Sequence, residues 1–129
     1  MDFEIDFYER ILKEKGDFLQ ALTALAELYT RRGLYEKGLE VDKRLMHLQP
    51  EDPYVLYNLA CSYSLLNQID KARPIIKLAI LSGYDDWAFL EQDQDLANLR
   101  QDDDFKQYFA KMKMQSRNRI TSATRAQDV

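Results

Sequence analysis

The stretch ALTALAELYTRRGLYEKG (residues 21–38) returns thirty-four residues later as VLYNLACSYSLLNQIDKA (residues 55–72). The identical pairs across this shift are Leu22 with Leu56, Leu25 with Leu59, Ala26 with Ala60, Tyr29 with Tyr63 and Lys37 with Lys71. A fixed period of this length is typical of repeat proteins, in which neighbouring copies of one unit bury each other's apolar faces. The period therefore decides the fold class before any single motif does.

Each copy has the pattern of two amphipathic helices. In the first copy, apolar residues spaced by three and four define one helix face, namely Leu22, Leu25, Ala26 and Tyr29. Gly33 follows this face, and glycine ends a helix readily because it accepts a left-handed backbone. The second copy has Asn67 and Gln68 at the same place. We therefore expect one helix hairpin in each copy, with its turn at these residues.

Prolines mark the other boundaries. Pro50 and Pro53 bracket an acidic pair, a combination that ends one helix and favours the start of the next. Pro74 lies inside the last helix of the second copy, where it removes one backbone donor. We expect either a kink at Pro74 or a late helix start near Asp70.

Residues 19–84 resemble two tetratricopeptide repeats. The family's Leu, small residue and aromatic residue fall on Leu25, Ala26 and Tyr29 and again on Leu59, Ala60 and Tyr63, its second-helix small residue falls on Gly38 and Ala72, and its closing proline falls on Pro50. The sequence departs from the pattern where Leu22 and Leu56 replace Trp, where Asp42 and Ile76 replace an aromatic residue, and where Tyr84 replaces the second closing proline. The resemblance implies an all-α fold, a right-handed superhelical stack of antiparallel helix pairs.

The two ends of the chain are expected to cap this stack. Residues 2–15 take the place of a second repeat helix without its partner, and their apolar residues Phe3, Phe7, Ile11 and Leu12 are expected to cover the first pair. The segment Gly83–Phe109 resembles a closing segment of bacterial repeat proteins, with a short helix, a DL..LR turn and an amphipathic cap. Its apolar residues are expected to bury the last open face, namely Trp87, Phe89, Leu90, Leu96, Leu99, Phe105 and Phe109.

These expectations divide the chain into one helical domain and a tail. The domain spans residues 1–114, with an N-terminal capping helix at 1–16, the first repeat at 17–50, the second at 51–84 and capping helices at 85–114. The apolar pattern fades in residues 115–129, so we expect disorder or a mobile helix end there. Residues 1–105 carry a net charge of −9 (12 basic and 21 acidic residues), and residues 106–129 carry +5 (6 basic and 1 acidic).

The composition favours a protein of the cytoplasm. No uncharged apolar run approaches the roughly 20 residues of a membrane-spanning helix, and the acidic start MDFEIDFYER does not resemble a secretory signal. The single cysteine, Cys61, can form no internal disulfide. We expect no membrane insertion and a reducing compartment.

We expect no enzymatic activity, no cofactor and no metal. The chain has one histidine and no glycine-rich phosphate loop, and His47 near a helix end is better explained by the helix dipole than by proton transfer. Cys61 is a packing residue or, with less support, a redox sensor, since no basic neighbour lowers its pKa. Asp93 and Asp95, and the run of Asp102 to Asp104, favour helix caps over a calcium loop, which needs a glycine and a distant glutamate.

The resemblance implies a non-catalytic protein-interaction module, an adaptor, scaffold or assembly factor that binds a peptide in its concave groove. The expected groove residues are Thr23, Glu27, Thr30, Tyr54, Tyr57, Asn58, Cys61 and Leu65. Asn58 matches a family position that hydrogen-bonds the ligand backbone, although these residues also fit an ordinary exposed helix face. The acidic body favours a basic or apolar partner. A clamp for a chaperone EEVD carboxylate is not expected, because Thr23 and Glu27 replace its Lys and Asn, and Ala88 and Gln92 stand where its other bases would be.

Three alternatives stay open. Repeat proteins of this kind include secretion chaperones that hold an unfolded protein in the same groove. Short stacks also leave end surfaces for self-association, so a homo-oligomer is a second possibility. The tail carries the basic residues Lys111, Lys113, Arg117, Arg119 and Arg125, which suggest contact with nucleic acid or an anionic membrane. A solubilising or partner-steering tail is favoured because the charges are widely spaced and lie beside an acidic body.

Overall fold

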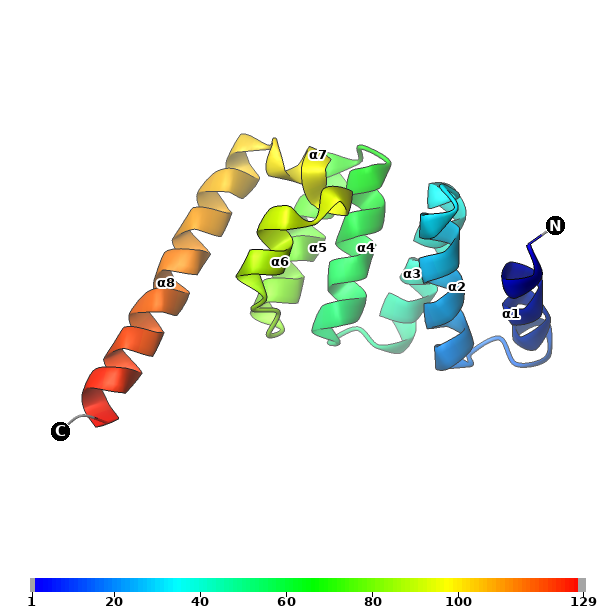
Figure 1. The fold of residues 1–129 in the computed structure, drawn as a ribbon, viewed down its shortest axis with the longest axis horizontal. Helices are drawn as coiled ribbons and strands as arrows, with labels where there is room; N and C mark the ends of the chain where they lie inside the picture. The colour runs from blue at the N-terminus through cyan, green and yellow to red at the C-terminus, as the bar shows by residue number, and fades with distance from the viewer. Residues whose placement is uncertain (1, 128–129) are drawn as a thin grey trace.

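The regular structure of the described part of the chain is helical throughout. The computed structural model describes the backbone of residues 2–127 and the side chains of residues 2–120, and this part contains no strand. The elements are α1 (Phe3–Glu14), α2 (Leu19–Arg31), α3 (Tyr35–Leu48), α4 (Pro53–Leu65), α5 (Ile69–Leu81), α6 (Trp87–Gln92), the 3-10 helix η1 (Gln94–Leu96), α7 (Ala97–Arg100) and α8 (Asp103–Gln127). The expected all-α class is confirmed. Helices α1 to α5 follow one another in chain order along the longest axis (Figure 1).

Each of the first four helices packs on the next one. The closest associations are those of α4 with α5 and of α2 with α3, and α3 also packs against α4. The apolar faces read from the sequence form two clusters of buried residues, one centred on Leu22 and Leu25, the other on Leu56, Ala60 and Ile76. The repeated apolar spacing thus builds one cluster for each copy.

The turns of the two hairpins have the same construction. Gly33 and Asn67 both have a left-handed backbone, with φ of 78° and 56°. The N–H of Leu34 donates to the carbonyl of Tyr29 at 2.8 Å, and the N–H of Gln68 donates to the carbonyl of Tyr63, also at 2.8 Å. These bonds satisfy carbonyls that the helix end leaves free, so the turns expected at these residues are confirmed.

The proline expectations also hold. Pro53 is the first residue of α4, and the Asp52 carboxylate caps that helix by accepting the N–H groups of Tyr54 (2.9 Å) and Val55 (3.2 Å). Helix α5 begins at Ile69, next to the expected start, which leaves Pro74 in its second turn. One backbone hydrogen bond is lost there.

The C-terminal segment closes the second copy. Leu90, Leu96, Leu99 and Phe105 are buried, as expected, whereas Phe89 is 53% exposed, so the expectation that it helps bury the end was wrong. The hydroxyl of Ser64 at the end of α4 accepts the N–H of Leu99 at 3.1 Å.

A salt bridge fastens the last helix to α5. The Arg73 guanidinium donates from two nitrogens to the carboxylate of Asp102, at 2.8 and 2.9 Å. That hydrogen-bonded pair holds the pKa of Asp102 at about 2. The same carboxylate caps α8 by accepting the N–H of Phe105, so one residue starts the helix and fixes its position.

Helix α1 covers the first pair with a face that differs in part from the expected one. Leu12 packs against the first cluster as expected, together with Ile5 and Tyr8, whereas Phe3 is 77% exposed and Phe7 58% exposed. Polar contacts set this rotation: the Tyr29 hydroxyl donates to Glu9 at 2.5 Å, and Arg32 donates to Asp2 at 2.7 Å. The expectation that Phe3 and Phe7 cover the first pair was wrong because both faces of α1 are apolar.

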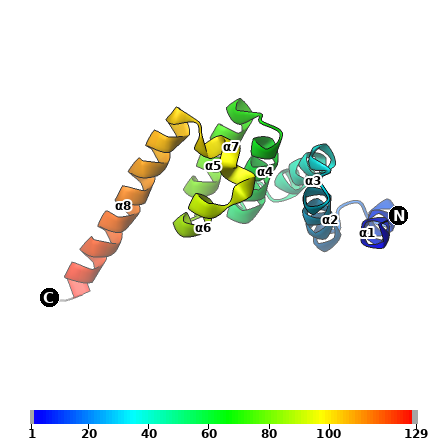
Figure 2. The same cartoon turned by 45° about the horizontal axis from the view of Figure 1, so that its top comes forward.

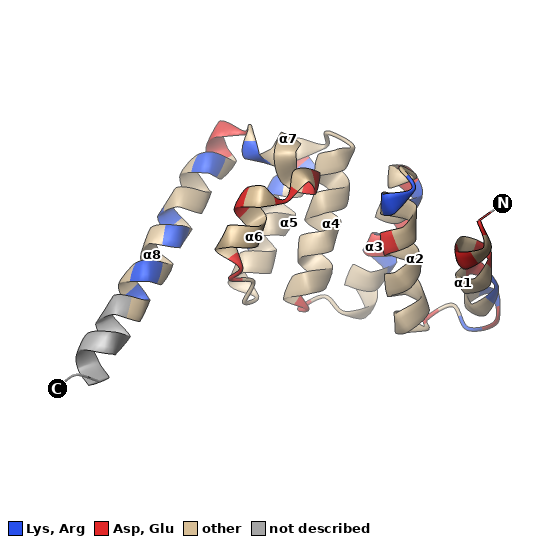
Figure 3. Ribbon diagram, in the orientation of Figure 1, with Lys and Arg blue, Asp and Glu red and all other residues tan. Residues whose placement is uncertain are grey.

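Helix α8 leaves the body at an angle and continues through Gln127, as two views agree (Figures 1 and 2). Its basic residues contrast with the acidic residues on the body and at the start of α8 (Figure 3). The boundary expected at residue 115 therefore falls inside a helix, which is consistent with the absence of Gly and Pro after Gly83. Mobility of residues 115–127 stays a prediction. The side chain of Arg125 and residues 128–129 lie outside the described part.

Across the described residues, none of the helices combines the length and the apolar character that crossing a membrane requires.

Candidate binding pocket between the two repeats

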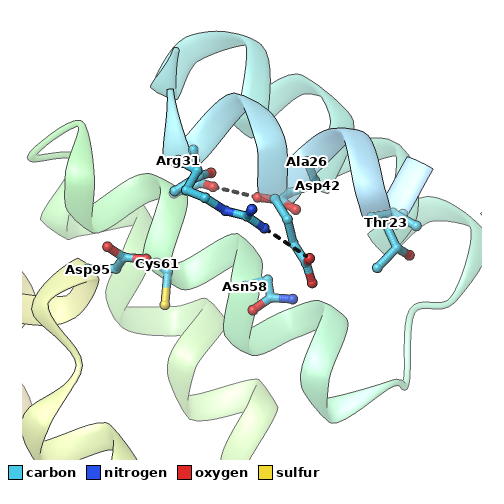
Figure 4. A pocket seen from close by; sticks show the side chains of 11 residues that line it. Thr23, Ala26, Arg31, Asp42, Asn58, Cys61 and Asp95 are labelled. Carbon is cyan, nitrogen blue, oxygen red and sulfur yellow. Dashed lines mark hydrogen bonds and ion pairs between the residues drawn. The ribbon is translucent and has the colours of Figure 1, made fainter. Parts of the chain in front are cut away.

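A pocket of about 300 Å³ lies between the two helix pairs (Figure 4). Helix α2 supplies one wall, α3 the floor, α4 the opposite wall, and η1 one end. The residues that line it are Thr23, Ala26, Glu27, Thr30 and Arg31 from α2, Asp42 and Leu45 from α3, Asn58, Cys61 and Ser62 from α4, and Asp95 from η1.

The spacing of three and four residues that places apolar side chains in the core also determines which side chains face this pocket. Leu22, Leu25 and Tyr29 point into the first cluster, so the residues between them, Thr23 and Glu27, lie on the free side of α2 and are exposed. In α4, Asn58 is exposed in the same way, one residue before the buried Leu59.

Asp42 is the least expected residue of the pocket. It occupies the place where the repeat pattern has an aromatic residue, and its side chain is only 4% exposed. The hydroxyl of Ser62 donates to one of its carboxylate oxygens at 2.5 Å. Burial raises the pKa of Asp42 to about 6, and the hydrogen bond from Ser62 opposes this effect only in part. A carboxyl group with a pKa of about 6 therefore lies at the floor of the pocket.

A hydrogen-bonded cluster closes the end of the pocket near η1. The Tyr57 hydroxyl donates to Asp93 at 2.6 Å, and the Cys61 thiol contacts the same oxygen at 3.8 Å. The other oxygen of Asp93 accepts the N–H of Asp95 at 3.0 Å. Burial, and secondarily the carboxylates of Asp93 and Asp95, raise the pKa of Cys61 well above its ordinary value. The thiol stays protonated, which supports packing rather than redox chemistry.

Two of the acidic residues expected to cap helices in the C-terminal segment do so, whereas Asp95 faces the pocket. Asp93 caps η1, and Asp102 caps α8. Burial, followed by the nearby charge of Asp93, raises the pKa of Asp95, which faces the pocket.

The pocket lining is acidic. It includes the carboxylates of Glu27, Asp42 and Asp95 and one cation, Arg31. Arg31 lies 3.9 Å from Glu27, and both side chains are more than half exposed, so this surface pair contributes little energy. With all four groups ionised, the lining carries a net charge of −2 (one positive and three negative).

The structure brings together five of the eight expected groove residues, namely Thr23, Glu27, Thr30, Asn58 and Cys61. Tyr54 and Leu65 lie outside the pocket, and Tyr54 is 67% exposed. Tyr57 is only 4% exposed, with its ring stacked on that of Tyr84 at 4.3 Å between centroids. Tyr57 therefore belongs to the core and offers little surface to a ligand.

The sequence did not predict a role in the pocket for Asp42, Ser62 or Asp95. The available signal was the replacement of an aromatic residue by Asp42 in the middle of an apolar pattern. A charged residue at a core position is rare unless it is paired or functional.

Two longer proteins are similar to parts of this chain. A chloroplastic protein from Arabidopsis thaliana is 33% identical over 102 residues, which cover 75% of this chain and 30% of that protein. The BBSome complex member BBS4 homolog from Drosophila melanogaster is 32% identical over 65 residues, which cover 50% of this chain and 13% of that protein. No family model matches the chain, and no solved structure matches it significantly. The chain thus spans less than a third of the length of these curated relatives.

Proposed function

We propose that this chain is a non-catalytic protein-interaction module of the tetratricopeptide type. The observation that carries the proposal is the acidic pocket between the two helix pairs, whose α2 and α4 walls present exposed polar residues to one opening. The ligand in this proposal is an extended segment of a partner protein with basic character, as the charge of the lining favours. The role is that of an adaptor, scaffold or assembly factor.

The repeat geometry supports the assignment to this type of fold. The two left-handed turns and their matching hydrogen bonds are offset by thirty-four residues, and α3 packs on α4 so that one hairpin stacks on the next. The resemblance implies that such hairpins stack into a right-handed superhelix, and this arrangement is part of the proposal. The Drosophila relative is a member of a complex, a role that fits a module for protein contacts. A cytoplasmic location is part of the proposal.

Reversing the charge of Glu27 on the pocket wall should strongly reduce partner capture. We expect Glu27→Lys to reduce recovery of the partner from native host lysate by roughly tenfold or more, because a new cation repels a basic segment. The measurement is an affinity pull-down quantified by mass spectrometry. Glu40→Lys on α3 is a matched control: Glu40 also forms a weak surface pair, with Lys43, and is 72% exposed.

The comparison of these two variants decides the proposal. A partner that is retained by the intact chain and by Glu40→Lys but lost by Glu27→Lys places recognition at the pocket. A partner held equally by all three proteins would exclude the pocket as the binding surface and move recognition to α8 or to the outer helices.

Self-association is a second candidate function, favoured by the outer face of α1. This face carries Phe3, Phe7 and the half-buried Ile11 beside Asp6 and Arg10. An antiparallel pairing of two α1 helices about a two-fold axis at Phe7 sets Phe3 of one copy against Ile11 of the other. The face is therefore self-complementary in its apolar residues.

We expect the α1 pair to be weak and concentration-dependent, since a helix of 12 residues offers less surface than the roughly 800 Å² per partner of a standard interface. Phe7→Glu should shift the chain to the monomer in sedimentation equilibrium. Leu81→Glu, which replaces another exposed apolar residue (75% exposed), should leave the association unchanged. A monomer at all concentrations for the unaltered chain would exclude this function.

A further inference from the structure

Within the described residues, no cation lies beside the buried carboxylate of Asp42. Its side chain is 4% exposed, and within the described residues its one hydrogen bond comes from the neutral hydroxyl of Ser62. Buried carboxylates in proteins are normally paired with a cation or held by several donors, because loss of water otherwise costs several kcal/mol. At neutral pH this group therefore lacks the partner that its burial calls for.

The partner can reach Asp42 only through the pocket. Asp42 lies at the floor of the pocket. Its second carboxylate oxygen is not fully buried, because every fully buried side-chain oxygen or nitrogen in the described residues has a hydrogen-bond partner and the Ser62 hydroxyl contacts only the first oxygen. Figure 4 shows Asp42 between the α2 wall and the α4 residues Asn58 and Cys61. The one cation of the lining, Arg31, is already near Glu27 at the rim.

The chemistry of the lining indicates which kind of cation can pair with Asp42. Nowhere in the described residues do three or more His, Cys, Asp or Glu side chains lie together in a group that could hold a metal ion. Ala26 and Leu45 instead contribute apolar surface to the lining, although they are only 6% and 3% exposed. An apolar stem that ends in one positive charge fits such a site, as a Lys or Arg side chain does.

We propose that the pocket binds one Lys or Arg side chain of the partner protein, whose charged end pairs with the Asp42 carboxylate. Asp42 receives the cation, the Ser62 hydroxyl orients the carboxylate, and Ala26 and Leu45 contact the stem. Glu27 and Asp95 at the opening attract the cation, while Asn58 is placed to hydrogen-bond the backbone that carries it. This inference rests on the proposed interaction function and names its specificity element.

The first test uses blocked single residues as probes of the intact chain. N-acetyl-arginine amide and N-acetyl-lysine amide are titrated against the ¹⁵N-labelled protein, with the uncharged N-acetyl-citrulline amide and N-acetyl-norleucine amide as controls. We expect saturable shifts of the amide signals of Ala26, Asn58 and Ser62 with the charged probes only. Loss of a charge-assisted hydrogen bond should make Asp42→Asn bind roughly tenfold more weakly.

Asp42→Asn keeps the size of the side chain and an oxygen that accepts from Ser62, so the variant retains the fold. Glu27→Gln is the matched control at the rim, where screening by water limits the loss of affinity to about threefold or less. Equal binding of arginine and citrulline probes, equal binding by Asp42→Asn, or no shift with any probe would overturn the inference. Tighter binding of free arginine than of the blocked form would overturn it too, in favour of a free amino acid.

The second test separates this inference from the proposed function. In the lysate pull-down, a partner lost by Glu27→Lys but fully retained by Asp42→Asn would leave the interaction function standing and overturn the Asp42 assignment. If both variants recover the partner as well as the unaltered chain does, the proposed function is excluded as well. Loss with both variants, and retention with Glu40→Lys, is the result that we expect.

Discussion

Replacing Phe105 with alanine lowers the free energy of unfolding by about 3–5 kcal/mol, the usual cost of removing a fully buried aromatic side chain. Phe105 is 1% exposed and belongs to the larger apolar cluster together with Leu90, Leu96 and Leu99. Its ring also stacks on Phe109 at 5.9 Å between centroids. Truncation of Phe105 to alanine leaves a cavity at the junction between α8 and the second repeat.

Urea unfolding followed by circular dichroism measures this effect. Met114→Ala is the control on the same helix, because Met114 is 65% exposed and its truncation should change stability by no more than about 0.5 kcal/mol. Equal stability of the Phe105 variant and the unaltered chain would mean that α8 does not close the core.

The second large effect is a gain in stability for Asp42→Asn at neutral pH. The pKa of Asp42 rises from its ordinary value of 3.8 to about 6 in the folded protein, chiefly through burial. The folded state therefore holds its proton more tightly than the unfolded state does, so the free energy of unfolding falls as pH rises through this window. Above pH 6 the loss in the free energy of unfolding levels off at about 3 kcal/mol. Asp42→Asn avoids this loss because its side-chain amide is neutral.

The difference in unfolding free energy between Asp42→Asn and the unaltered chain should therefore be near zero below about pH 4 and grow until about pH 6. The other ionisable groups that face the pocket are Glu27, Arg31, Cys61 and Asp95; all are present in both proteins, so their titration largely cancels. A difference that is constant between pH 4 and pH 7 would show that Asp42 ionises normally in the folded state. Greater stability without the charge is the expected signature of a binding residue.

Much of the fold could be predicted because it depends on local chemistry. The left-handed turns at Gly33 and Asn67 and the caps at Asp52 and Asp102 each follow from what one residue can do for a helix end. The rotation of α1 could not be predicted in this way, because Phe3 and Phe7 recur as regularly as Ile5 and Tyr8. Contacts with the first helix pair determine which face of α1 is buried. These contacts cannot be derived from the apolar pattern of α1 alone.

The same distinction applies to the pocket. Thr23, Glu27 and Asn58 were identifiable because they lie on the free side of helices whose core faces are clear. Tyr57 was expected to contact a ligand, but its ring packs on Tyr84, which comes from beyond the end of α5. The contribution of Asp95 to the pocket likewise depends on how the C-terminal segment returns to α4, a tertiary contact that no periodicity specifies.

The packing of each helix on its sequence neighbour also bears on how the chain folds. Helices α1 to α5 make most of their contacts with the helix directly before or after them in the chain. Formation of these native contacts therefore requires the closure of few long loops. Helical proteins with such local topology fold on the order of microseconds to milliseconds. The closure by Arg73 and Asp102 spans 29 residues and joins the last segment to a hairpin that can already exist, so nascent chains emerging from a ribosome can gain structure from the N-terminal side before α8 is made.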